Sequence, residues 1–436
     1  MRLLLAIISG KIIHFFGKFI GKASNLPGAV ALKICPDLMS RIKFKGKIIA
    51  VTGSNGKTSS ANMVAHILKE NGYKVSNNAK GSNLIGGVAT TLLTSSDLSG
   101  YIDDDFTVLE VDERFSRLIF KHFSPDLLLI TNLFRDQLTR NGNVDVIIEK
   151  LTQSIKPKTR LVLNANDPIS SLLASENERV YYALERTSLS SDEPISITHD
   201  AKVCPKCFGR MNYSFYHYNH IGGFECSKCG YSNQPAKYIS GNVNILAGDF
   251  ELNGLPVHTE YKSIFNILNI TGAIAVCCEA GLLIEDCVKA ASAFSISRER
   301  YDEFEVNGRK AVMILSKNQN PVSFDQSISY ILEQSGDKTV IVYVNNINHT
   351  NNLDTTWLYD ISFERLKGKI DTIVCTGPRA YDLAVRLDLC DFDPDSIIIS
   401  PDIKNLKSEI NNTNGTIYIL TEIYDAKNIV DSIKIK

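Results

Sequence analysis

The stretch that decides the fold is KIIAVTGSNGKT, residues 47–58. Its first six residues are mostly apolar and β-branched, which predicts a short buried strand. A glycine-rich turn follows, and apolar residues then recur with helical spacing over residues 58–71. Gly53 and Gly56 allow a backbone curl that turns successive N–H groups inward, and Lys57 follows at the start of the helix. The sequence therefore predicts a strand–loop–helix unit that binds phosphate groups.

The predicted loop carries the groups that hold a nucleoside triphosphate. The N-terminus of the helix adds partial positive charge, Lys57 would reach the terminal phosphates, and the Thr58 hydroxyl would hold Mg²⁺. The spacing is not the full G-x-x-x-x-G-K-[ST] pattern, because Val51 and Thr52 precede Gly53. The strand before the loop and the helix after it nevertheless favour ATP binding over a structural turn. The expected ATP contacts are Gly53, Ser54, Asn55, Gly56, Lys57, Thr58 and Ser59.

The rest of the chain alternates between apolar, strand-like runs and helical segments. The runs cover residues 106–111, 126–132 and 160–166 before a helical stretch at 265–294, and residues 310–316, 339–345, 371–377, 396–400 and 416–421 after it. Apolar strands that alternate with helices indicate a mainly parallel sheet covered on both faces. We therefore expect an α/β protein whose ligands bind at the carboxyl ends of the strands.

Length and composition set the outer limits. The chain has 436 residues and a mass of 48.3 kDa, so two or three domains are expected. Because 47 Lys and Arg balance 48 Asp and Glu, no overall positive field exists to hold nucleic acid. The expected domains are a helical N-terminal segment at 1–45, an ATP-binding domain at 46–296, and a smaller α/β domain at 297–436.

Four of the ten cysteines form two C-x-x-C pairs, Cys204 with Cys207 and Cys226 with Cys229, in an atypical stretch at about 200–240. Two such pairs give four thiolates that can close a tetrahedral Zn²⁺ site and leave no position for water. The sequence therefore predicts a structural zinc ribbon inserted in the ATP-binding domain. A reactive redox pair is the alternative. Aromatic residues in the stretch could stack nucleic-acid bases, but the nearby cations are too few to favour that function.

The location of the protein is indicated by the remaining cysteines and by the N-terminus. Six cysteines are scattered among mostly apolar neighbours, which fits buried thiols in a reducing cytoplasm. The apolar stretch from Leu3 to Ile8 is short and Lys11 follows soon after it, so a secretory signal is disfavoured. No apolar run reaches the length of about 18–20 residues that a membrane span needs. Lys11, Lys18 and Lys22 could share one polar side of an amphipathic helix. This helix either caps the core or lies on a membrane surface.

Several segments resemble the Mur ligases, which activate a carboxylate with ATP and join it to an amine. VTGSNGKTS (51–59) is similar to their ATP loop. The resemblance implies a Mg²⁺ ligand at Glu110 in LEVDE (109–113), nucleotide contacts at Asn164 and Asp167 in LNANDP (163–168) and at Asn266 and Asn269 in FNILN (265–269), and an arginine facing the phosphates at Arg300. Gln137 stands where the family usually has a histidine for a second metal, which leaves that metal position open.

The C-terminal third resembles one branch of these ligases more specifically. NNINHTNNLDTTWLYDISFE (345–364) and SKNQNPVSFDQ (316–326) are similar to segments of MurT-type proteins, the synthetase subunits of lipid II isoglutaminyl synthases. Such subunits work with a GatD-type glutaminase, and they supply a carboxylate to the catalytic histidine of that partner. The resemblance assigns this role to Asp354, which precedes Thr356-Trp357, with Asp360 as the second choice. No cysteine of this chain sits in a nucleophile-elbow turn, which favours a separate glutaminase chain.

The resemblance implies a fold and a function together. The fold is α/β, with a Mur-ligase-like central ATPase domain, an inserted four-cysteine zinc ribbon and a smaller C-terminal domain. The function is ATP-dependent amidation of the α-carboxylate of D-glutamate in lipid II, with Lys57, Glu110 and Asp354 as catalytic residues and with ATP, Mg²⁺ and Zn²⁺ bound. The expected location is the cytoplasm, at the inner face of the membrane. A ligase that joins an amino acid, a folate-type glutamate ligase and a nucleotide-binding scaffold stay as alternatives.

Overall fold

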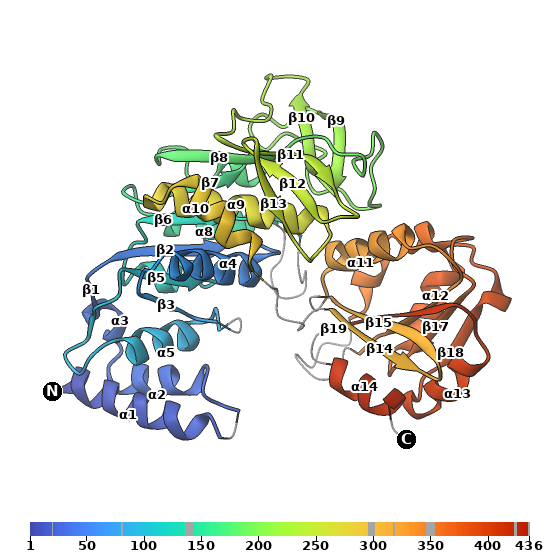
Figure 1. Cartoon of the computed structure of the whole chain (residues 1–436), viewed down its shortest axis with the longest axis horizontal. Helices are drawn as coiled ribbons and strands as arrows, with labels where there is room; N and C mark the ends of the chain where they lie inside the picture. The colour runs from blue at the N-terminus through green and yellow to red at the C-terminus, as the bar shows by residue number, and fades with distance from the viewer. Residues whose placement is uncertain are drawn as a thin grey trace. The chain divides into compact units, whose positions relative to one another are not determined.

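The computed structural model of the protein describes residues 1–19, 21–79, 82–135, 144–294, 301–316, 319–345, 354–422 and 425–434. The chain forms two compact units. The larger unit comprises residues 1–134, 143–193 and 201–296, and the smaller unit comprises residues 135–142, 194–200 and 297–436. Each unit has its own sheet and its own hydrophobic core (Figure 1).

The larger unit holds most of the regular structure. Its helices are α1 (Arg2–Gly17), α2 (Leu26–Ile34), α3 (Leu38–Arg41), α4 (Lys57–Glu70), α5 (Ile85–Ser95), α6 (Ser116–Phe120), α8 (Val144–Ser154), α9 (Ile264–Ala280) and α10 (Ile284–Ser292). Its strands are β1 (Lys43–Phe44), β2 (Lys47–Thr52), β3 (Val75–Asn77), β4 (Tyr101–Ile102), β5 (Phe106–Glu110), β6 (Leu127–Ile130), β7 (Arg160–Asn164), β8 (Arg179–Leu184), β9 (Met211–Tyr218), β10 (Ile221–Cys226), β11 (Tyr238–Asn244), β12 (Asp249–Leu252) and β13 (Leu255–His258).

The main sheet brings the carboxyl ends of several strands to one edge. Its order is β13-β12-β11-β8-β7-β6-β2-β5-β3, and every neighbouring pair from β11 to β3 is parallel. The strand β2 lies between β5 and β6, and its Val51 pairs with Glu110 while its Thr52 pairs with Ile130. The loop after β2 therefore lies beside the ends of both neighbours. The α/β fold with a mainly parallel sheet is confirmed, although β12 and β13 add an antiparallel edge.

Both faces of this sheet are covered by helices, as the apolar strands predict. Ile48 and Ala50 of β2 pack into a buried cluster with side chains of α5 and α8, while the alternate residues of β2 face the other side. Figure 1 shows α4, α9 and α10 together on one side. The helix α9 approaches closely, because a Cβ on Gly272 would meet the ring of Tyr182. This packing holds α4 and the loop before it against the sheet.

The connection from β8 to β11 is unusual for a parallel sheet, where a helix commonly makes the crossover. The two strands are parallel neighbours, yet residues 185–237 between them form the β9–β10 hairpin and carry the four cysteines. The hairpin strands are antiparallel, and Ser191 bridges to Tyr216 of β9. The cysteine-rich stretch is therefore the crossover itself, and it leads back into the main sheet at Tyr238.

The N-terminal segment packs into the core of the larger unit. Ala6 and Ile7 of α1 are fully buried in the same cluster as Leu92 of α5. The Lys11 ammonium donates hydrogen bonds to carbonyls at the end of α5, including that of Ser96. Lys11 is thus a cap for α5, although its spacing placed it with Lys18 and Lys22 on a polar side. No described helix is long and apolar enough to cross a membrane.

The smaller unit is a second α/β layer structure. Its strands are β14 (Tyr301–Val306), β15 (Arg309–Ser316), β16 (Lys338–Tyr343), β17 (Thr372–Thr376), β18 (Ile397–Ser400) and β19 (Thr416–Glu422), and its helices are α11 (Pro321–Glu333), α12 (Ala380–Asp388), α13 (Leu406–Asn411) and α14 (Ala426–Lys434), with a 3₁₀ turn η3 at Thr356–Asp360. The sheet order is β14-β15-β19-β16-β17-β18. Only the β14–β15 pair is antiparallel. The sequence missed β14, because residues 301–306 are polar and charged.

Candidate nucleotide and zinc sites

The phosphate loop needs glycine at two positions. Gly53 and Gly56 have φ angles of 134° and 81°, in the region that side chains disfavour. A Cβ on Gly53 would collide with the Thr131 hydroxyl, and one on Gly56 would collide with the side-chain amide of Asn269. The loop therefore packs tightly against the residues that follow β6 on one side and against the N-terminal half of α9 on the other. This places Asn269, a residue that the Mur resemblance assigns to the nucleotide, directly against the loop.

The loop is fastened by the two residues that follow β6. The Asn55 N–H donates to Asn132 Oδ1 at 2.9 Å, and the Asn55 carbonyl accepts a hydrogen bond from Thr131 Oγ1 at 2.6 Å. The Ser54 N–H donates to the Asn132 carbonyl at 2.8 Å. These bonds fix the curl before any ligand arrives. The half-buried Thr58 and Ser59 then continue into the first turn of α4, whose first amides have no intrahelical partner.

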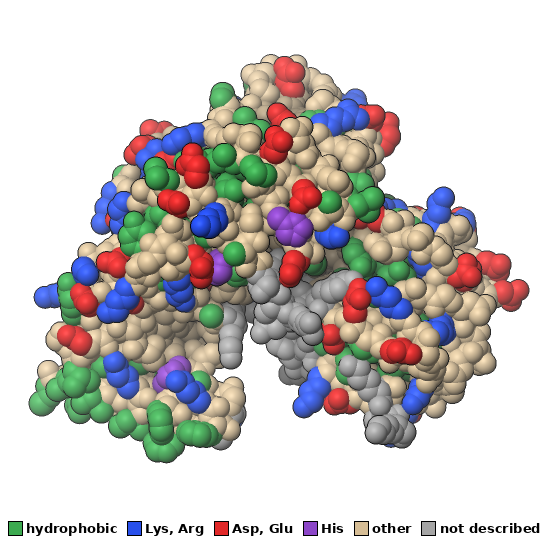
Figure 2. All heavy atoms as spheres, viewed as in Figure 1, with side chains coloured by type: hydrophobic (Ala, Val, Ile, Leu, Met, Phe, Trp, Pro, Cys, Tyr) green, Lys and Arg blue, Asp and Glu red, His purple; other side chains and the backbone are tan. Residues whose placement is uncertain are grey.

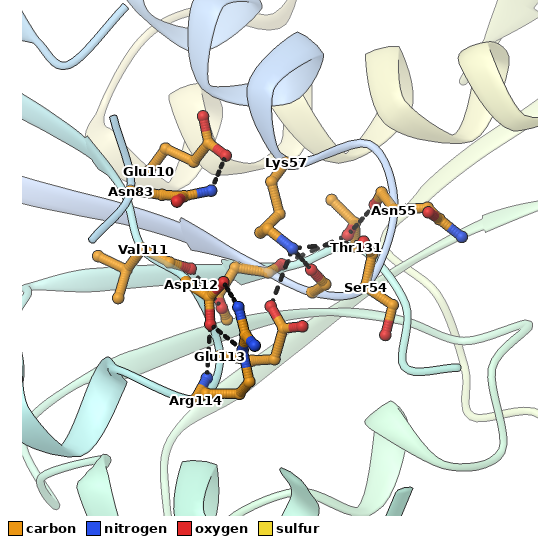
Figure 3. Close-up of polar contacts among 12 residues, drawn as sticks. Ser54, Asn55, Lys57, Asn83, Glu110, Val111, Asp112, Glu113, Arg114 and Thr131 are labelled. Carbon is orange, nitrogen blue, oxygen red and sulfur yellow. Dashed lines mark hydrogen bonds and ion pairs between the residues drawn. The ribbon is translucent and has the colours of Figure 1, made fainter. Parts of the chain in front are cut away.

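Lys57 is the central charge of the site. Its side chain is only 6% exposed, and the ammonium donates to Glu113 Oε2 at 2.8 Å and to the Gly53 and Ser54 carbonyls (Figure 3). Burial alone would lower the pKa of Lys57, but the carboxylates of Glu113 and Asp112 outweigh it and raise the pKa. The lysine therefore stays charged. A buried cation that protein oxygens hold inside a phosphate loop can exchange those oxygens for phosphate oxygens.

Glu110 ends β5 beside this lysine and is itself held from one side. Its Oε1 accepts a hydrogen bond from Asn83 Nδ2 at 2.8 Å (Figure 3). Its N–H donates to Asn78 Oδ1 at 2.7 Å. The other carboxylate oxygen, Oε2, is buried and has no hydrogen-bond partner among the described residues. An unpartnered buried carboxylate oxygen is costly unless a cation meets it. Glu110 thus fits a Mg²⁺ ion as a donor, and Thr58, the residue after Lys57, carries the hydroxyl predicted as a further donor.

The next acidic residue is bound to its own arginine. Asp112 receives two hydrogen bonds from the Arg114 guanidinium, both 2.8 Å long, and one from the Arg114 N–H, 3.0 Å long. Burial would raise the pKa of Asp112, but the Arg114 hydrogen bond and the Lys57 charge outweigh it and lower the pKa to about 2. The carboxylate is therefore ionised throughout the physiological pH range. It adds negative charge near Lys57 without contacting the ammonium.

The LNANDP turn after β7 braces the loop after β6. Asn164 Nδ2 donates to the Thr131 carbonyl at 3.2 Å, and Asp167 Oδ2 accepts from the Leu133 N–H at 3.0 Å. The second Asp167 oxygen accepts from the Ile169 N–H at 2.8 Å. Asn164 and Asp167 are both fully buried. The protein contacts of these two side chains therefore shape the turn, and they act on the phosphate loop through the residues after β6.

The other predicted nucleotide contacts have different surroundings. Asn266 lies one turn before Asn269 on α9, and its Nδ2 donates to Thr259 Oγ1 at 3.0 Å and to the Tyr261 carbonyl at 3.1 Å. Asn266 thus fastens the chain that leads into α9. Arg300 and Gln137 lie outside the described residues.

The four cysteines lie together at the tip of the ribbon. Their sulfur atoms are all within 4.8 Å of one another, with Cys204 Sγ 3.8 Å from Cys229 Sγ and Cys207 Sγ 3.4 Å from Cys226 Sγ. Four sulfurs around a tetrahedral Zn²⁺ lie about 3.8 Å apart, because each Zn–S bond is about 2.3 Å long. The quartet therefore has the size of a zinc site. All four ligands come from protein, so no position stays open for a substrate.

Backbone groups around the quartet are arranged as two matching turns. The Lys206 and Lys228 N–H groups donate to Cys204 Sγ and Cys226 Sγ, both at 3.4 Å. Each turn ends with a residue at positive φ, 59° at Phe208 and 68° at Gly230. N–H donors stabilise thiolates, and such outer contacts orient metal ligands. The donor set and the turns both fit a structural Zn²⁺.

The ribbon is bonded to the LNANDP turn at several points. The Gly222 N–H donates to the Asn166 carbonyl at 2.9 Å, and Tyr231 Oη donates to the Pro168 carbonyl at 2.9 Å. Asn233 Nδ2 donates to the Ala165 carbonyl at 2.9 Å. These contacts join residues on either side of the cysteine pair at 226–229 to the turn that braces the phosphate loop. The ribbon is therefore a support of the nucleotide site.

In the smaller unit, Asp354 lies two residues before the 3₁₀ turn η3, and Asp360 is the last residue of that turn. Asp354 is half-buried, and its Oδ1 accepts from the Thr356 N–H at 2.9 Å. Asp360 lies 3.9 Å from Arg135 Nη1, and burial raises its pKa although the Arg135 charge opposes this. Trp357 between them is buried, with its ring centre 5.3 Å from that of Phe324. Packing of Trp357 therefore fixes the turn. Each aspartate lies in the field of an arginine, Asp354 in that of Arg379 and Asp360 in that of Arg135.

Comparisons with known proteins agree with both halves of this architecture. The family model of the Mur ligase middle domain matches residues 51–221, and that of the MurT ligase C-terminal domain matches residues 315–426. The MurT subunit of lipid II isoglutaminyl synthase (glutamine-hydrolyzing) from Staphylococcus aureus is 29% identical over 92% of this chain and 91% of its own. The chain thus combines a Mur ligase middle domain with a MurT ligase C-terminal domain.

Solved Mur-type ligases share the fold of this chain. A pseudomurein peptide ligase type C from Methanothermus fervidus matches with a TM-score of 0.71 and 19% identity, over 92% of this chain and 81% of its own. A MurF ligase from Thermotoga maritima, in complex with ADP, matches with a TM-score of 0.59 and 16% identity, over 92% and 83%. The predicted fold class, including its C-terminal domain and four-cysteine cluster, is confirmed.

Several contributors to the candidate nucleotide site were not predicted from the sequence. Glu113, the partner of Lys57, is the last residue of LEVDE, and only Glu110 of that segment was assigned a role. Asn83, which holds Glu110, lies in a GSN stretch with no helical or strand pattern. Thr131 and Asn132 are the last two residues of the predicted strand run 126–132. Their polar character at a strand end was the available signal, since such ends line ligand sites in parallel sheets.

Proposed function

We propose that this chain is the ATP-dependent synthetase that amidates the α-carboxylate of D-glutamate in the stem peptide of lipid II. One observation carries the proposal: the larger unit holds a charged lysine in a phosphate loop beside an unpartnered glutamate oxygen, in a chain whose last third matches the MurT C-terminal domain. The named substrate of the Staphylococcus aureus relative is lipid II. The reaction is a carbon–nitrogen ligation.

The chemistry proceeds in two displacements at one carboxyl group. A carboxylate oxygen attacks the γ-phosphorus of ATP, the bond to the β-phosphate oxygen breaks, and an acyl phosphate and ADP result. Ammonia then attacks the acyl carbon, the carbon–oxygen bond to phosphate breaks, and the amide is left after loss of a proton. Lys57 and the amides at the start of α4 stabilise the charge on the transferred phosphoryl group. A Mg²⁺ ion held by Glu110 and Thr58 would neutralise further charge there.

Zinc has a structural part in this proposal. Cys204, Cys207, Cys226 and Cys229 would hold one Zn²⁺ with no open coordination position, so the ion takes no part in the ligation. It would keep the ribbon rigid, and the ribbon holds the turn at residues 164–168. The ATP contacts expected at Asn164 and Asp167 are then indirect, through the loop after β6.

The nitrogen comes from a second chain in this proposal. A GatD-type glutaminase would release ammonia from glutamine with a cysteine nucleophile and a histidine base, and that histidine needs a carboxylate partner. Asp354 is the better candidate, because it fills the position before Thr356-Trp357 to which the MurT resemblance assigns this role. Asp354 is also half-exposed, which suits a group that acts on a partner.

The location follows from the substrate. Lipid II carries its stem peptide at the membrane, so an enzyme that uses ATP on this peptide works in the cytoplasm at the inner face of the membrane. The scattered buried cysteines are consistent with a reducing compartment.

The test of this function is amidation by the purified chain with its co-purified glutaminase, given lipid II, ATP and glutamine. We expect mass spectrometry to show one hydroxyl of the stem peptide replaced by an amine, with release of ADP and phosphate. The Asp354→Asn variant should lose about a hundredfold or more in the glutamine-driven rate, because the glutaminase histidine loses its orienting carboxylate. It should retain the rate with ammonium chloride.

The matched control is Asp360→Asn, at the other end of the same turn. We expect it to retain the glutamine-driven rate within a few-fold. A product that has gained an amino acid in place of ammonia would establish a peptide-adding ligase, and absence of ATP turnover with every substrate would leave a nucleotide-binding scaffold. If both reactions of Asp354→Asn keep the unmodified rate, Asp354 is not the carboxylate supplied to the partner.

A further inference from the structure

Helix α1 is apolar on two sides, and only one of them is covered. Its inner side packs on α5 and α2: Ala6 and Ile7 are fully buried, and a Cβ on Gly10 would collide with Leu93. The Lys11 ammonium is bonded to carbonyls at the end of α5. The inner contacts therefore fix the rotation of α1 about its axis, so its outer side is presented as a rigid surface.

The outer side of α1 is a continuous apolar strip, which we call the α1 strip. Successive residues of an α-helix are about 100° apart, so positions 4, 5, 8, 12, 15 and 16 fall within an arc of about 120°. The strip comprises Leu4, Leu5, Ile8, Ile12, Phe15, Phe16 and, just beyond the helix, Phe19, and these side chains are between 36% and 77% exposed. Figure 2 shows hydrophobic side chains gathered over α1 at the lower left.

The aromatic end of the α1 strip forms a small cluster of its own. The ring of Phe15 lies 5.4 Å from that of Phe16 and 5.8 Å from that of Phe19, in edge-to-face arrangements. Single exposed apolar residues are normal on a protein surface, but a contiguous strip of this kind marks an interaction site.

The charge of the segment indicates what covers the strip. Residues 1–36 contain no Asp or Glu, in a chain whose net charge is only −1. They contain Arg2, Lys11, Lys18, Lys22 and Lys33, and all of these except the capping Lys11 are exposed. Lys18 and Lys22 stand at the aromatic end. An apolar strip flanked by cations and free of acids is complementary to an anionic surface with an apolar interior.

We propose that the α1 strip lies in the interface of an anionic lipid bilayer, with its apolar side chains in the headgroup–acyl boundary and Lys18 and Lys22 among the lipid phosphates. The helix lies along the surface, because its 16 residues span only about 24 Å and the hydrocarbon core is about 30 Å thick. This membrane contact rests on the proposed function, because its role would be to hold the ligase at the surface where a lipid-linked substrate is found.

The test is co-flotation of the full chain, purified with its glutaminase, with vesicles of phosphatidylcholine and phosphatidylglycerol or of phosphatidylcholine alone. We expect binding to the anionic vesicles. Ile12→Gln/Phe16→Gln should lower the fraction bound at least about tenfold, because both residues lie on the strip. Lys18→Glu/Lys22→Glu should lower binding to anionic vesicles and leave the weak binding to neutral vesicles unchanged.

The matched control is Val385→Gln/Leu389→Gln, two residues four apart at the surface of α12 with similar exposure to Ile12 and Phe16. We expect it to bind vesicles as the unmodified protein does. Equal binding by the α1 and α12 variants, or no vesicle binding by the unmodified protein, would overturn the proposal. Loss of the glutaminase or of a self-associated species from the α1 variant, with vesicle binding unchanged, would instead assign the strip to a protein contact and would also overturn it.

Failure of this proposal and failure of the proposed function give different results. Amidation of a water-soluble lipid II analogue without the polyprenyl chain should be unaffected by either α1 variant, because α1 contributes no group to the phosphate loop. Vesicle binding without any amidation would remove the proposed function and keep the membrane contact. Amidation of both substrates without vesicle binding would remove the membrane contact and keep the proposed function.

Discussion

The phosphate loop and the cysteine quartet are both loop sites of the larger unit, but they differ in how fully protein atoms satisfy them. At the loop, Lys57 is held by replaceable oxygens, and Glu110 keeps a buried oxygen without a partner among the described residues. At the quartet, four sulfurs face one another at the size of one ion, and backbone N–H groups complete the surroundings.

This difference separates a site that exchanges its ligand from one that keeps it. The lysine ammonium can exchange its protein oxygen partners for phosphate oxygens at small cost in free energy, since one charge-assisted hydrogen bond replaces another. A closed set of four thiolates has no position for substrate and releases its ion only when the protein opens. The two sites are also connected, because the ribbon bonds to the turn that braces the phosphate loop.

The largest effect on turnover is expected at the exchanging site. Lys57→Ala should lower kcat for amidation at least about a thousandfold, because the phosphoryl group loses its nearest cation. It should also lower the melting temperature, since Glu113 is only 1% exposed and would be left as an unpaired buried charge. Steady-state kinetics and calorimetry measure the two effects.

A double variant separates catalysis from stability. Lys57→Ala/Glu113→Gln should recover most of the lost melting temperature and none of the activity. Lys69→Ala, on the exposed end of the same helix, is the control and should match the unmodified protein. Near-normal turnover by Lys57→Ala would remove the phosphate loop from the reaction.

A smaller effect is expected at the closed site, and it acts at a distance. Cys204→Ser should lose the zinc and raise KM for ATP about tenfold, because a loosened ribbon no longer fixes the turn that braces the loop. Metal analysis and ATP titrations measure this. Cys278→Ser, at a half-buried cysteine outside the quartet, should change neither quantity. Unchanged zinc content in Cys204→Ser would argue against a four-thiolate site.

Glu113→Gln tests whether the exchangeable partner of Lys57 is needed for turnover. We expect kcat to change by less than about tenfold, because the Gly53 and Ser54 carbonyls and the nearby Asp112 still hold the ammonium in place. The nucleotide-free protein should be less stable by about 1–3 kcal/mol, since a buried ion pair has become a hydrogen bond from a charged ammonium to a neutral amide. A loss of activity as large as that of Lys57→Ala would make Glu113 a direct ligand in the reaction.

Local patterns predicted much of this structure, and long-range contacts account for what they missed. The strand at 47–52 and the helix after the loop depend on apolar spacing that a short window contains, and both formed as expected. Glu113 and Lys57 are 56 residues apart, so only the pairing of β5 with β2 brings them together. The spacing of Lys11 suggested a position on the solvent-facing side of the helix. In the folded chain α1 packs on α5, and the Lys11 ammonium donates to carbonyls at the end of α5.

The crossover between β8 and β11 was also beyond local reasoning. The two C-x-x-C pairs predicted a zinc ribbon, because the ligand spacing is contained in the stretch itself. Nothing in that spacing says that the hairpin replaces a helix between parallel strands, or that Gly222 and Tyr231 bond to the turn after β7. Those contacts depend on where β8 and β11 sit in the sheet, which is a property of the whole fold.

The smallest effect at neutral pH is expected at His217, which supports the ribbon from inside. His217 Nε2–H donates to the Leu184 carbonyl at 3.1 Å and Nδ1 accepts from Ser190 Oγ at 3.0 Å, so the ring is bound in its neutral form. Burial lowers the pKa of His217 to about 4, although the Leu184 hydrogen bond opposes this. In the unfolded chain the imidazole has a pKa of about 6.5. The folded state therefore binds the proton less readily than the unfolded state does.

The sign of the pH dependence follows from that difference. The stability contributed by neutral His217 is complete above about pH 6.5 and is lost as the pH falls from there towards 4, up to about 3 kcal/mol. His217→Gln keeps a donor for Leu184 and removes the titration. In urea unfolding of the larger unit, the variant and the unmodified protein should differ by a constant amount above pH 6.5, and the gap should shift in favour of the variant below it. Acid also protonates the cysteines of both proteins, so only the difference between their free energies of unfolding is diagnostic. If this difference stays constant down to pH 4, the stability of the ribbon does not depend on a neutral imidazole.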